Sequence, residues 1–93
     1  MGSLRRNEGY RAQHGTHLSL FVIQKEDDVR VIVHDFNKGA IDGRVADVRE
    51  PSVDDGQKTA IALANAYLSQ VLNEPEPPDD PSWQKYTDTF ESL

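Results

Sequence analysis

The sequence predicts a small α+β domain in which a three-stranded antiparallel meander packs on one long helix. Two runs rich in β-branched and aromatic residues are separated by a short acidic loop, and a third run follows a turn that contains glycine. A segment with apolar residues at helical spacing then begins after a serine. At 93 residues, the chain is long enough for one core and too short for separate substrate and cofactor domains.

The first two strands are predicted at residues 17–24 and 29–36, joined by the loop "KEDD". Pairing Gln24 with Val29 decides which side chains share a face, because side chains alternate along a strand. One face is uniformly aliphatic and is predicted to form the core: Leu18, Leu20, Val22, Val29, Val31 and Val33. We call the other face the mixed face: His17, Ser19, Phe21, Ile23, Arg30, Ile32, His34 and Phe36.

The third strand is predicted at residues 40–48, after a turn at residues 37–39 in which Gly39 takes a left-handed conformation. Asp42-Gly43 is a second turn or a bulge in this interpretation. Simple antiparallel pairing preserves the alternation of faces. It therefore assigns Val45 to the aliphatic face and three residues to the mixed face: Arg44, Ala46 and Val48.

The helix is predicted at residues 53–73. Ser52 is placed to cap its first turn, and Asp55 three residues later completes a capping box. Pro75 ends it, because proline lacks the amide hydrogen that a helix interior needs. Its apolar residues form one stripe that is suited to covering a sheet: Ala60, Ile61, Ala64, Tyr67, Leu68, Val71 and Leu72.

The two ends of the chain are predicted to lie outside this domain, which spans residues 17–74. Residues 1–16 are polar and lack periodicity, which is typical of a flexible arm. Residues 75–93 form an acidic tail that begins as a stiff proline-rich linker. A short helix at 81–92 would align three aromatic side chains: Trp83, Tyr86 and Phe90. The sequence leaves open whether this tail docks on the mixed face or stays free to bind a partner.

Composition limits the classes of function. The net charge of −6 disfavours a protein whose main task is to bind nucleic acid, since that affinity comes largely from lysine and arginine. The apolar runs are far shorter than the roughly 18 residues of a membrane span. The polar start lacks the apolar stretch of a signal peptide, which predicts a cytoplasmic protein. The absence of cysteine excludes disulfide scaffolds and thiolate nucleophiles.

The start of the helix resembles the end of a phosphate-binding loop, because Gly56 and Lys58 stand close together. A Walker A loop needs the lysine directly after its second glycine and a first glycine at fixed spacing, and both features are missing. Asp54 and Asp55 would also compete with a phosphate for the helix N-terminus. We therefore interpret the segment as an ordinary capped helix and expect no cofactor.

Three histidines and one set of triad residue types are the remaining candidates for a chemical site. His14 and His17 have H-x-x-H spacing and the predicted hairpin brings His34 near, but no cysteine or well-placed carboxylate completes a tetrahedral metal site. A hydrolytic triad uses serine, histidine and aspartate, and the mixed face offers Ser19, His34 and Asp42. The sequence lacks the nucleophile elbow and the oxyanion loop that such a triad needs. We expect no metal, no catalytic residue and no enzymatic activity.

Two functions remain open. The first is a non-enzymatic protein-interaction module that binds an unidentified protein, or a second copy of itself, through the mixed face or the C-terminal tail. The alternative is a nucleic-acid-binding platform on the mixed face, where aromatic side chains stack with bases and cations meet phosphates. The candidate partner-binding residues are Phe21, Arg30, Ile32, His34, Phe36, Arg44, Trp83, Tyr86 and Phe90.

Overall fold

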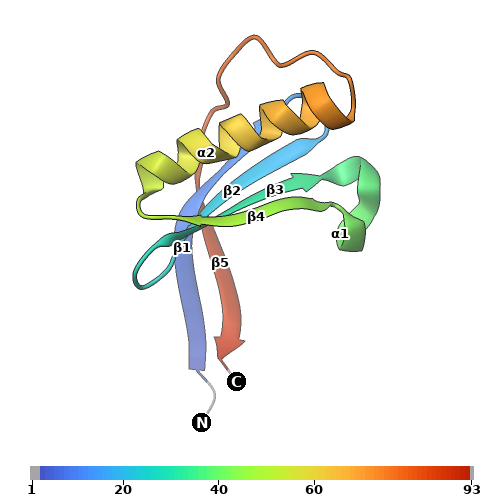
Figure 1. Cartoon of the computed structure of the whole chain (residues 1–93). Helices are drawn as coiled ribbons and strands as arrows, with labels where there is room; N and C mark the ends of the chain where they lie inside the picture. Colours follow the sequence, from blue (N-terminus) through green and yellow to red (C-terminus); the bar gives the residue numbers. More distant parts are fainter. Residues whose placement is uncertain (1–2, 93) are drawn as a thin grey trace.

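The computed structural model describes residues 3–92, and the side chains of residues 8–39 and 42–87. Five antiparallel strands form one sheet in the order β4-β3-β2-β1-β5, with one long helix on one face (Figure 1). The strands are β1 (Ser3–His14), β2 (Leu18–Gln24), β3 (Val29–Asp35), β4 (Arg44–Glu50) and β5 (Gln84–Ser92). The helical segments are η1 (Phe36–Lys38), α1 (Gly39–Asp42), α2 (Val53–Ala66) and the π-helical turn η2 (Tyr67–Val71). The α+β class is confirmed, but the three-stranded meander is wrong because the sheet has five strands.

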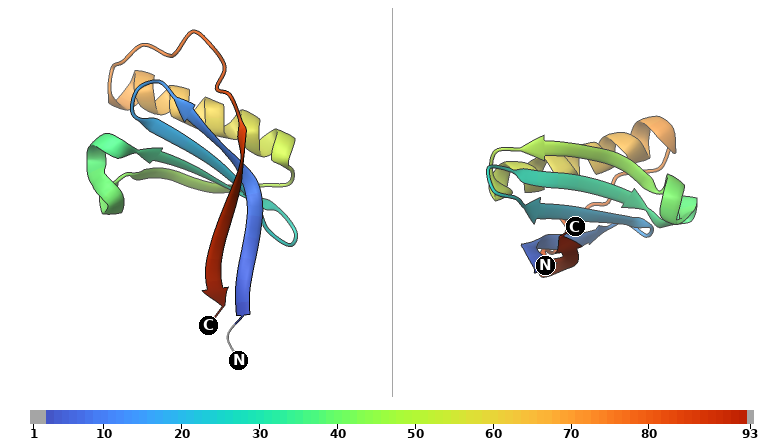
Figure 2. Two further views of the ribbon diagram at one scale, coloured as in Figure 1. Left: turned by 180° about the vertical axis from the view of Figure 1, so that it is seen from behind. Right: turned by 90° about the horizontal axis from the view of Figure 1, so that it is seen from below.

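The central hairpin has the predicted register, with Gln24 opposite Val29 and Leu18 opposite Asp35. The predicted aliphatic face is buried under α2 (Figure 2). The core consists of Leu18, Leu20, Val22, Val29, Val31, Val33, Ala60, Ala64 and Leu68. A register error of one residue would have exposed the strand side chains of this set, so burial on one face is what specifies the pairing.

Small residues let α2 lie close to the sheet. Gly56, Ala60 and Ala64 recur every four residues and are all buried. A Cβ atom on Gly56 would lie 2.8 Å from Cγ1 of Val22 and 2.9 Å from Cγ2 of Val29. Gly56, which made the segment resemble a phosphate-binding loop, is therefore at a point of close helix–sheet packing.

The ends of α2 follow from local sequence. The Oγ of Ser52 accepts a hydrogen bond from the amide of Asp55 at 3.2 Å, so the predicted cap is present. After Ala66 the chain forms the π-helical turn η2, which changes the angular spacing of the side chains that follow. Leu68 stays buried. Val71, which was predicted to belong to the apolar stripe, is instead 61% exposed. Within residues 3–92 no helix combines the length and the apolar composition that crossing a bilayer requires.

The third predicted strand begins later than expected. Residues 36–42 form helical turns, and β4 starts at Arg44. An irregularity at Val33/His34 places Ala46 opposite Val33 and Arg44 opposite His34. The extra residue changes the alternation of faces. Arg44 therefore lies on the mixed face as predicted, whereas Ala46, like Val48, lies on the helix-covered face.

The predicted N-terminal arm is part of the sheet. β1 pairs with β2 through Gly9–His14 and with β5 through Ser3–Arg11. A Cβ atom on Gly9 would collide with the carbonyl oxygen of Val22, so glycine is needed where β1 meets β2. Beyond this point β1 and β5 continue past the other strands as a two-stranded ribbon (Figure 2). The polar composition suggested a flexible arm, but backbone pairing with a distant strand supplies its hydrogen bonds.

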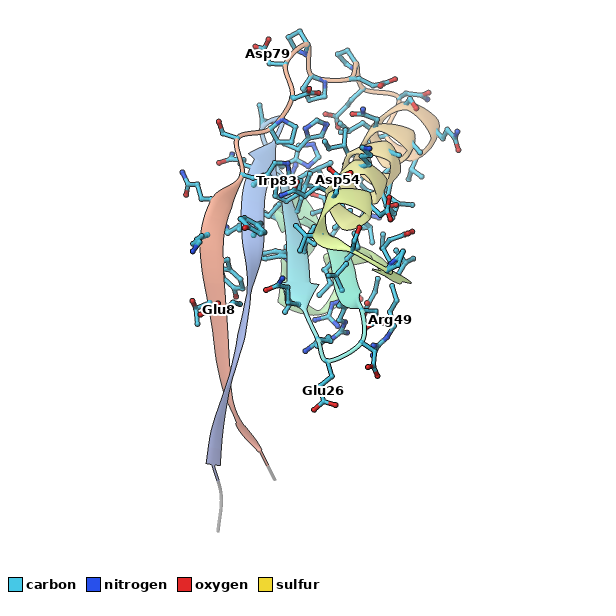
Figure 3. The ribbon with its side chains drawn as sticks, turned by 90° about the vertical axis from the view of Figure 1, so that its left-hand side faces the viewer. Glu8, Glu26, Arg49, Asp54, Asp79 and Trp83 are labelled. Carbon is cyan, nitrogen blue, oxygen red and sulfur yellow. The ribbon has the colours of Figure 1, made fainter. Side chains whose placement is uncertain are left out.

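The predicted C-terminal helix is also wrong, because its residues form strand β5. The connection from α2 arches past the helix end and then enters the sheet edge (Figure 1). Backbone pairing with β1 overrides the helical spacing of the aromatic residues, since a strand places them by a period of two. Trp83 precedes β5 and packs against the core cluster on the α2 side (Figure 3). The tail therefore docks as an edge strand.

We expect the fluorescence of Trp83, the single tryptophan, to report this docking. Because its ring is partly buried against the core, its emission should be blue-shifted from that of tryptophan in water and should shift to the red when urea unfolds the chain. The measurement is an emission spectrum at increasing urea concentration, with far-UV circular dichroism as the reference for unfolding. An emission typical of exposed tryptophan, unchanged by urea, would contradict the docked tail.

Candidate functional site

The mixed face is the sheet face opposite α2, and no described element covers it (Figure 2). Strand register extends it beyond the central hairpin. β1 contributes Gly9, Arg11 and Gln13, β4 contributes Arg44, Asp47 and Arg49, and β5 contributes Gln84 and Tyr86. The mixed face thus spans all five strands.

A shallow hollow of about 210 Å³ lies on the mixed face. It is lined by Phe21, Ile23, Lys25, Arg30, Ile32, His34, Arg44 and Tyr86. The rings of Phe21 and Tyr86 meet edge to face, with centroids 5.3 Å apart. The guanidinium carbon of Arg11 lies 6.0 Å from the centroid of Phe21. The hollow therefore combines an apolar floor with aromatic walls and cations around it.

The mixed face is cationic although the whole chain carries a net charge of −6. Among residues whose side chains the structure describes, the register places one aspartate, Asp47, on this face with four arginines: Arg11, Arg30, Arg44 and Arg49. Arg49 also pairs with Asp28, at 3.0 Å. Arg30 donates hydrogen bonds to both carboxylate oxygens of Asp47, at 2.9 Å and 2.5 Å, and Arg44 lies 3.5 Å from the same carboxylate. The hydrogen bonds from Arg30 hold the pKa of Asp47 below its usual range. Asp47 therefore stays ionised and positions two guanidinium groups beside the hollow.

Six of the nine predicted partner-binding residues line this hollow: Phe21, Arg30, Ile32, His34, Arg44 and Tyr86. Phe36 lies on η1, is 56% exposed, and has its ring centroid 4.9 Å from that of His34. Trp83 lies on the opposite side of the sheet. Phe90 pairs with Arg5 in the backbone register, and its side chain lies outside the described residues. The structure thus brings the predicted strand residues together with Tyr86, and places Trp83 on the other side of the sheet.

Sequence reasoning missed Arg11 and Asp47. Arg11 was assigned to the flexible arm, although Tyr10, Ala12 and His14 alternate with more polar residues in the manner of a half-buried strand. Asp47 was not considered because the shift of faces in β4 is not visible in the sequence. Both residues reach the site only through pairing between strands.

A second cluster of polar side chains is buried near the end of α2. Nδ1 of His17 lies 2.8 Å from Oδ1 of Asp35, and its Nε2 lies 3.2 Å from Oε1 of Glu74. The hydroxyl of Tyr67 donates to Oδ2 of Asp35 at 2.5 Å, and the amide of Asn37 donates to Oδ1 at 3.0 Å. His17 was predicted on the mixed face, but it belongs to the turn after β1 and points into this cluster.

The surroundings of these groups shift their pKa values. Hydrogen bonds with Asp35 and Glu74 raise the pKa of His17 against the opposing effect of burial. Burial alone would raise the pKa of Asp35, but hydrogen bonds from Tyr67, His17 and the amide of Asn37 outweigh it and leave the pKa below its usual range. Burial, reinforced by the hydrogen bond to Asp35, raises the pKa of Tyr67 to about 12. The cluster therefore surrounds an aspartate with three donors and fastens the segment that follows α2 to β3.

Neither site has the features of a metal centre. Within the described part of the chain, no three histidine, aspartate or glutamate side chains are placed to hold a metal ion. His14 and His17, considered above as a metal pair, have separate partners, because Nε2 of His14 lies 2.7 Å from Oδ1 of Asn65. Both histidines instead tie the first hairpin to the α2 side of the fold.

The cluster makes stability depend on pH. Because the pKa of His17 is raised, its stabilisation is fully present below its ordinary value of 6.5 and is lost as the pH rises through the raised value. Because the pKa of Asp35 is lowered, its stabilisation is present above 3.8 and is lost as the pH falls through the lowered value. The contribution of the cluster to the free energy of unfolding should therefore be largest between these two values.

Urea unfolding over a pH series measures this dependence. We expect the free energy of unfolding to decline as the pH rises from 6.5 through the raised pKa of His17, and a His17→Gln variant to lose that decline. The same alkaline decline in both proteins would contradict the assignment to His17.

Comparisons with protein-family models, with curated proteins and with solved structures find no match to this chain.

Proposed function

We propose that the protein is a non-enzymatic interaction module that binds another protein through the mixed face. The observation that carries this proposal is the hollow, where half-buried aromatic side chains and an isoleucine floor open to the surface beside arginines, on a face that no described element covers. Exposed apolar patches rimmed by polar groups are typical of association sites. Aromatic residues and arginine are also the side chains most enriched where partners bind tightly.

The mixed face is a better candidate than the C-terminal tail. Trp83 packs against the core cluster, and Tyr86 packs against Phe21. A free helical tail that binds a partner would have to leave both contacts and the pairing with β1. The partner is therefore expected to bind on the mixed face. This partner is either a different protein or a second copy of the chain.

Single-stranded nucleic acid is the second candidate function. The placement of Arg11 over Phe21, with Tyr86 beside it, favours this alternative because bases stack on aromatic rings and cations neutralise phosphates. The net charge of −6 opposes it, since a polyanion is attracted only where the arginines gather. Salt separates the two candidates, because nucleic-acid affinity falls steeply with salt and a largely apolar protein contact changes little.

A photo-crosslinking amino acid placed at position 44 tests the proposal in native host cells. Position 58 is the matched control, because Lys58 is exposed on α2, away from the mixed face, and its side chain pairs with the exposed Asp54. We expect a protein adduct from position 44 and not from position 58. An excess of the unmodified protein should compete away this capture, and the Arg44→Glu protein should compete about tenfold or more weakly, since like charges across an interface cost several kcal/mol. Equal protein capture from both positions, or nucleic acid alone at position 44, would refute the proposal.

A further inference from the structure

The size of the hollow restricts what it can hold. Its volume of about 210 Å³ is below the roughly 300–1,000 Å³ of sites for small molecules and cofactors. Its floor includes Ile23 and Ile32, which are almost completely buried between neighbouring side chains. Phe21 and Tyr86 form an edge-to-face wall beside them. The hollow therefore fits one apolar side chain of a larger partner.

The charges around the hollow restrict what flanks that side chain. Arg44 and Lys25 line the hollow, and Arg11 stands over Phe21. Asp47 accepts hydrogen bonds from Arg30 and lies 3.5 Å from Arg44, so one carboxylate partly balances these two guanidinium groups. The remaining excess is cationic and lies on both the β1 side and the β4 side of the hollow. Groups on either side of the bound apolar side chain would therefore be anionic.

We propose that the mixed face binds an extended acidic segment of a protein, with one apolar side chain in the hollow and carboxylates toward Arg11 and Arg44. This inference rests on the proposed function and names the chemistry of its partner. An extended segment fits because consecutive side chains alternate in direction, so one residue enters the hollow while residues two positions away reach the arginines. Arginine also suits carboxylates, since its planar guanidinium donates two parallel hydrogen bonds.

The distribution of charge favours a short acidic segment over a nucleic acid. Arginines gather on the mixed face, whereas the whole chain carries a net charge of −6. A phosphate backbone that continues past the hollow would meet this net negative charge, whereas a short segment would stay among the arginines.

The test measures binding of fluorescein-labelled peptides to the full chain by fluorescence anisotropy. The probe has the sequence Asp-Glu-Phe-Asp-Glu. The controls replace its acids with lysine or its phenylalanine with alanine, and an oligothymidine of eight nucleotides represents single-stranded nucleic acid. We expect only the acidic phenylalanine peptide to bind well. Its affinity should fall about tenfold or more in Arg44→Glu and in Arg11→Glu, and should stay unchanged in Lys58→Glu, with circular dichroism verifying the fold of each variant.

Several outcomes would overturn this inference. One is that the lysine peptide or the oligothymidine binds as tightly as the acidic phenylalanine peptide, or more tightly. Another is that the alanine peptide binds equally well. A third is that Arg44→Glu leaves the affinity for the acidic phenylalanine peptide unchanged. Chemical-shift perturbation by the acidic peptide should also map to the hollow and not to α2. If the crosslink at position 44 captures a protein but the acidic peptide does not bind, the inference fails and the proposed function stands. If position 44 captures no protein, the proposed function itself fails.

Discussion

Replacing Asp35 with alanine is expected to lower the free energy of unfolding by about 3–5 kcal/mol, the range for breaking a buried charged pair by removing one partner. Asp35 is 1% exposed and accepts hydrogen bonds from Tyr67, His17 and the amide of Asn37. Alanine would leave all three donors without their acceptor in a buried place. The raised pKa of His17 would also fall, because its largest cause is the hydrogen bond with Asp35.

Urea unfolding followed by circular dichroism, at a pH between the pKa values of Asp35 and His17, measures this loss. Asp35→Asn keeps the shape of the side chain and should cost less than alanine. Asp54→Ala is the matched control, because Asp54 is exposed on α2, and its effect should stay within about 0.5 kcal/mol. A loss below about 1 kcal/mol for Asp35→Ala would show that the cluster does not fasten α2 to the sheet.

Replacing Leu68 with alanine is expected to cost about 2–5 kcal/mol, because a core leucine leaves a cavity that its neighbours fill only in part. Leu68 is 3% exposed and is the largest side chain that the helical segments add to the core cluster. The helix residues at Gly56, Ala60 and Ala64 are small, so α2 approaches the sheet there and little side-chain volume is available to collapse into the cavity. The cost should therefore lie in the upper part of the range.

Two controls lie on the same helical segment. Val71 belongs to the same π-helical turn but is 61% exposed, so Val71→Ala should change the free energy of unfolding by about 0.5 kcal/mol or less. Lys58→Ala should stay within the same limit, because its pair with Asp54 is exposed and such pairs contribute little. The prediction would be wrong if Leu68→Ala and Val71→Ala were equally mild in urea unfolding. The interpretation of the segment as an ordinary capped helix would be wrong if Lys58→Ala removed a nucleotide-binding activity.

Local patterns were enough to predict the central hairpin and the helix. Alternation in residues 17–24 and 29–36 reports which side chains face the core, because a strand has a period of two and only one face is buried. The capping pair Ser52 and Asp55 reports the helix start for a similarly local reason, since the bond joins residues three apart. Most of the residues that line the hollow were found in the same way, from parity within the hairpin.

The ends of the chain could not be read in this way. β1 has a polar composition, and β5 has aromatic residues whose spacing also fits a helix. Each becomes a strand because the other supplies its backbone hydrogen bonds from about 80 residues away in sequence. Propensity is a weak local preference, and a ladder of long-range pairs overrides it.

The sequence by itself determined the α+β class, the buried face of the hairpin, the capped helix and the alternation that gathers Phe21, Arg30, Ile32 and His34 on one face. The tertiary structure alone decided that Arg11 and Tyr86 join them and that Trp83 does not. It also decided that His17 meets Asp35 and Glu74, and that Tyr67 donates to the same Asp35. The physical reason is the same in each case. Local sequence sets the direction of side chains along one element, whereas which elements become neighbours depends on burial and hydrogen bonding summed over the whole chain.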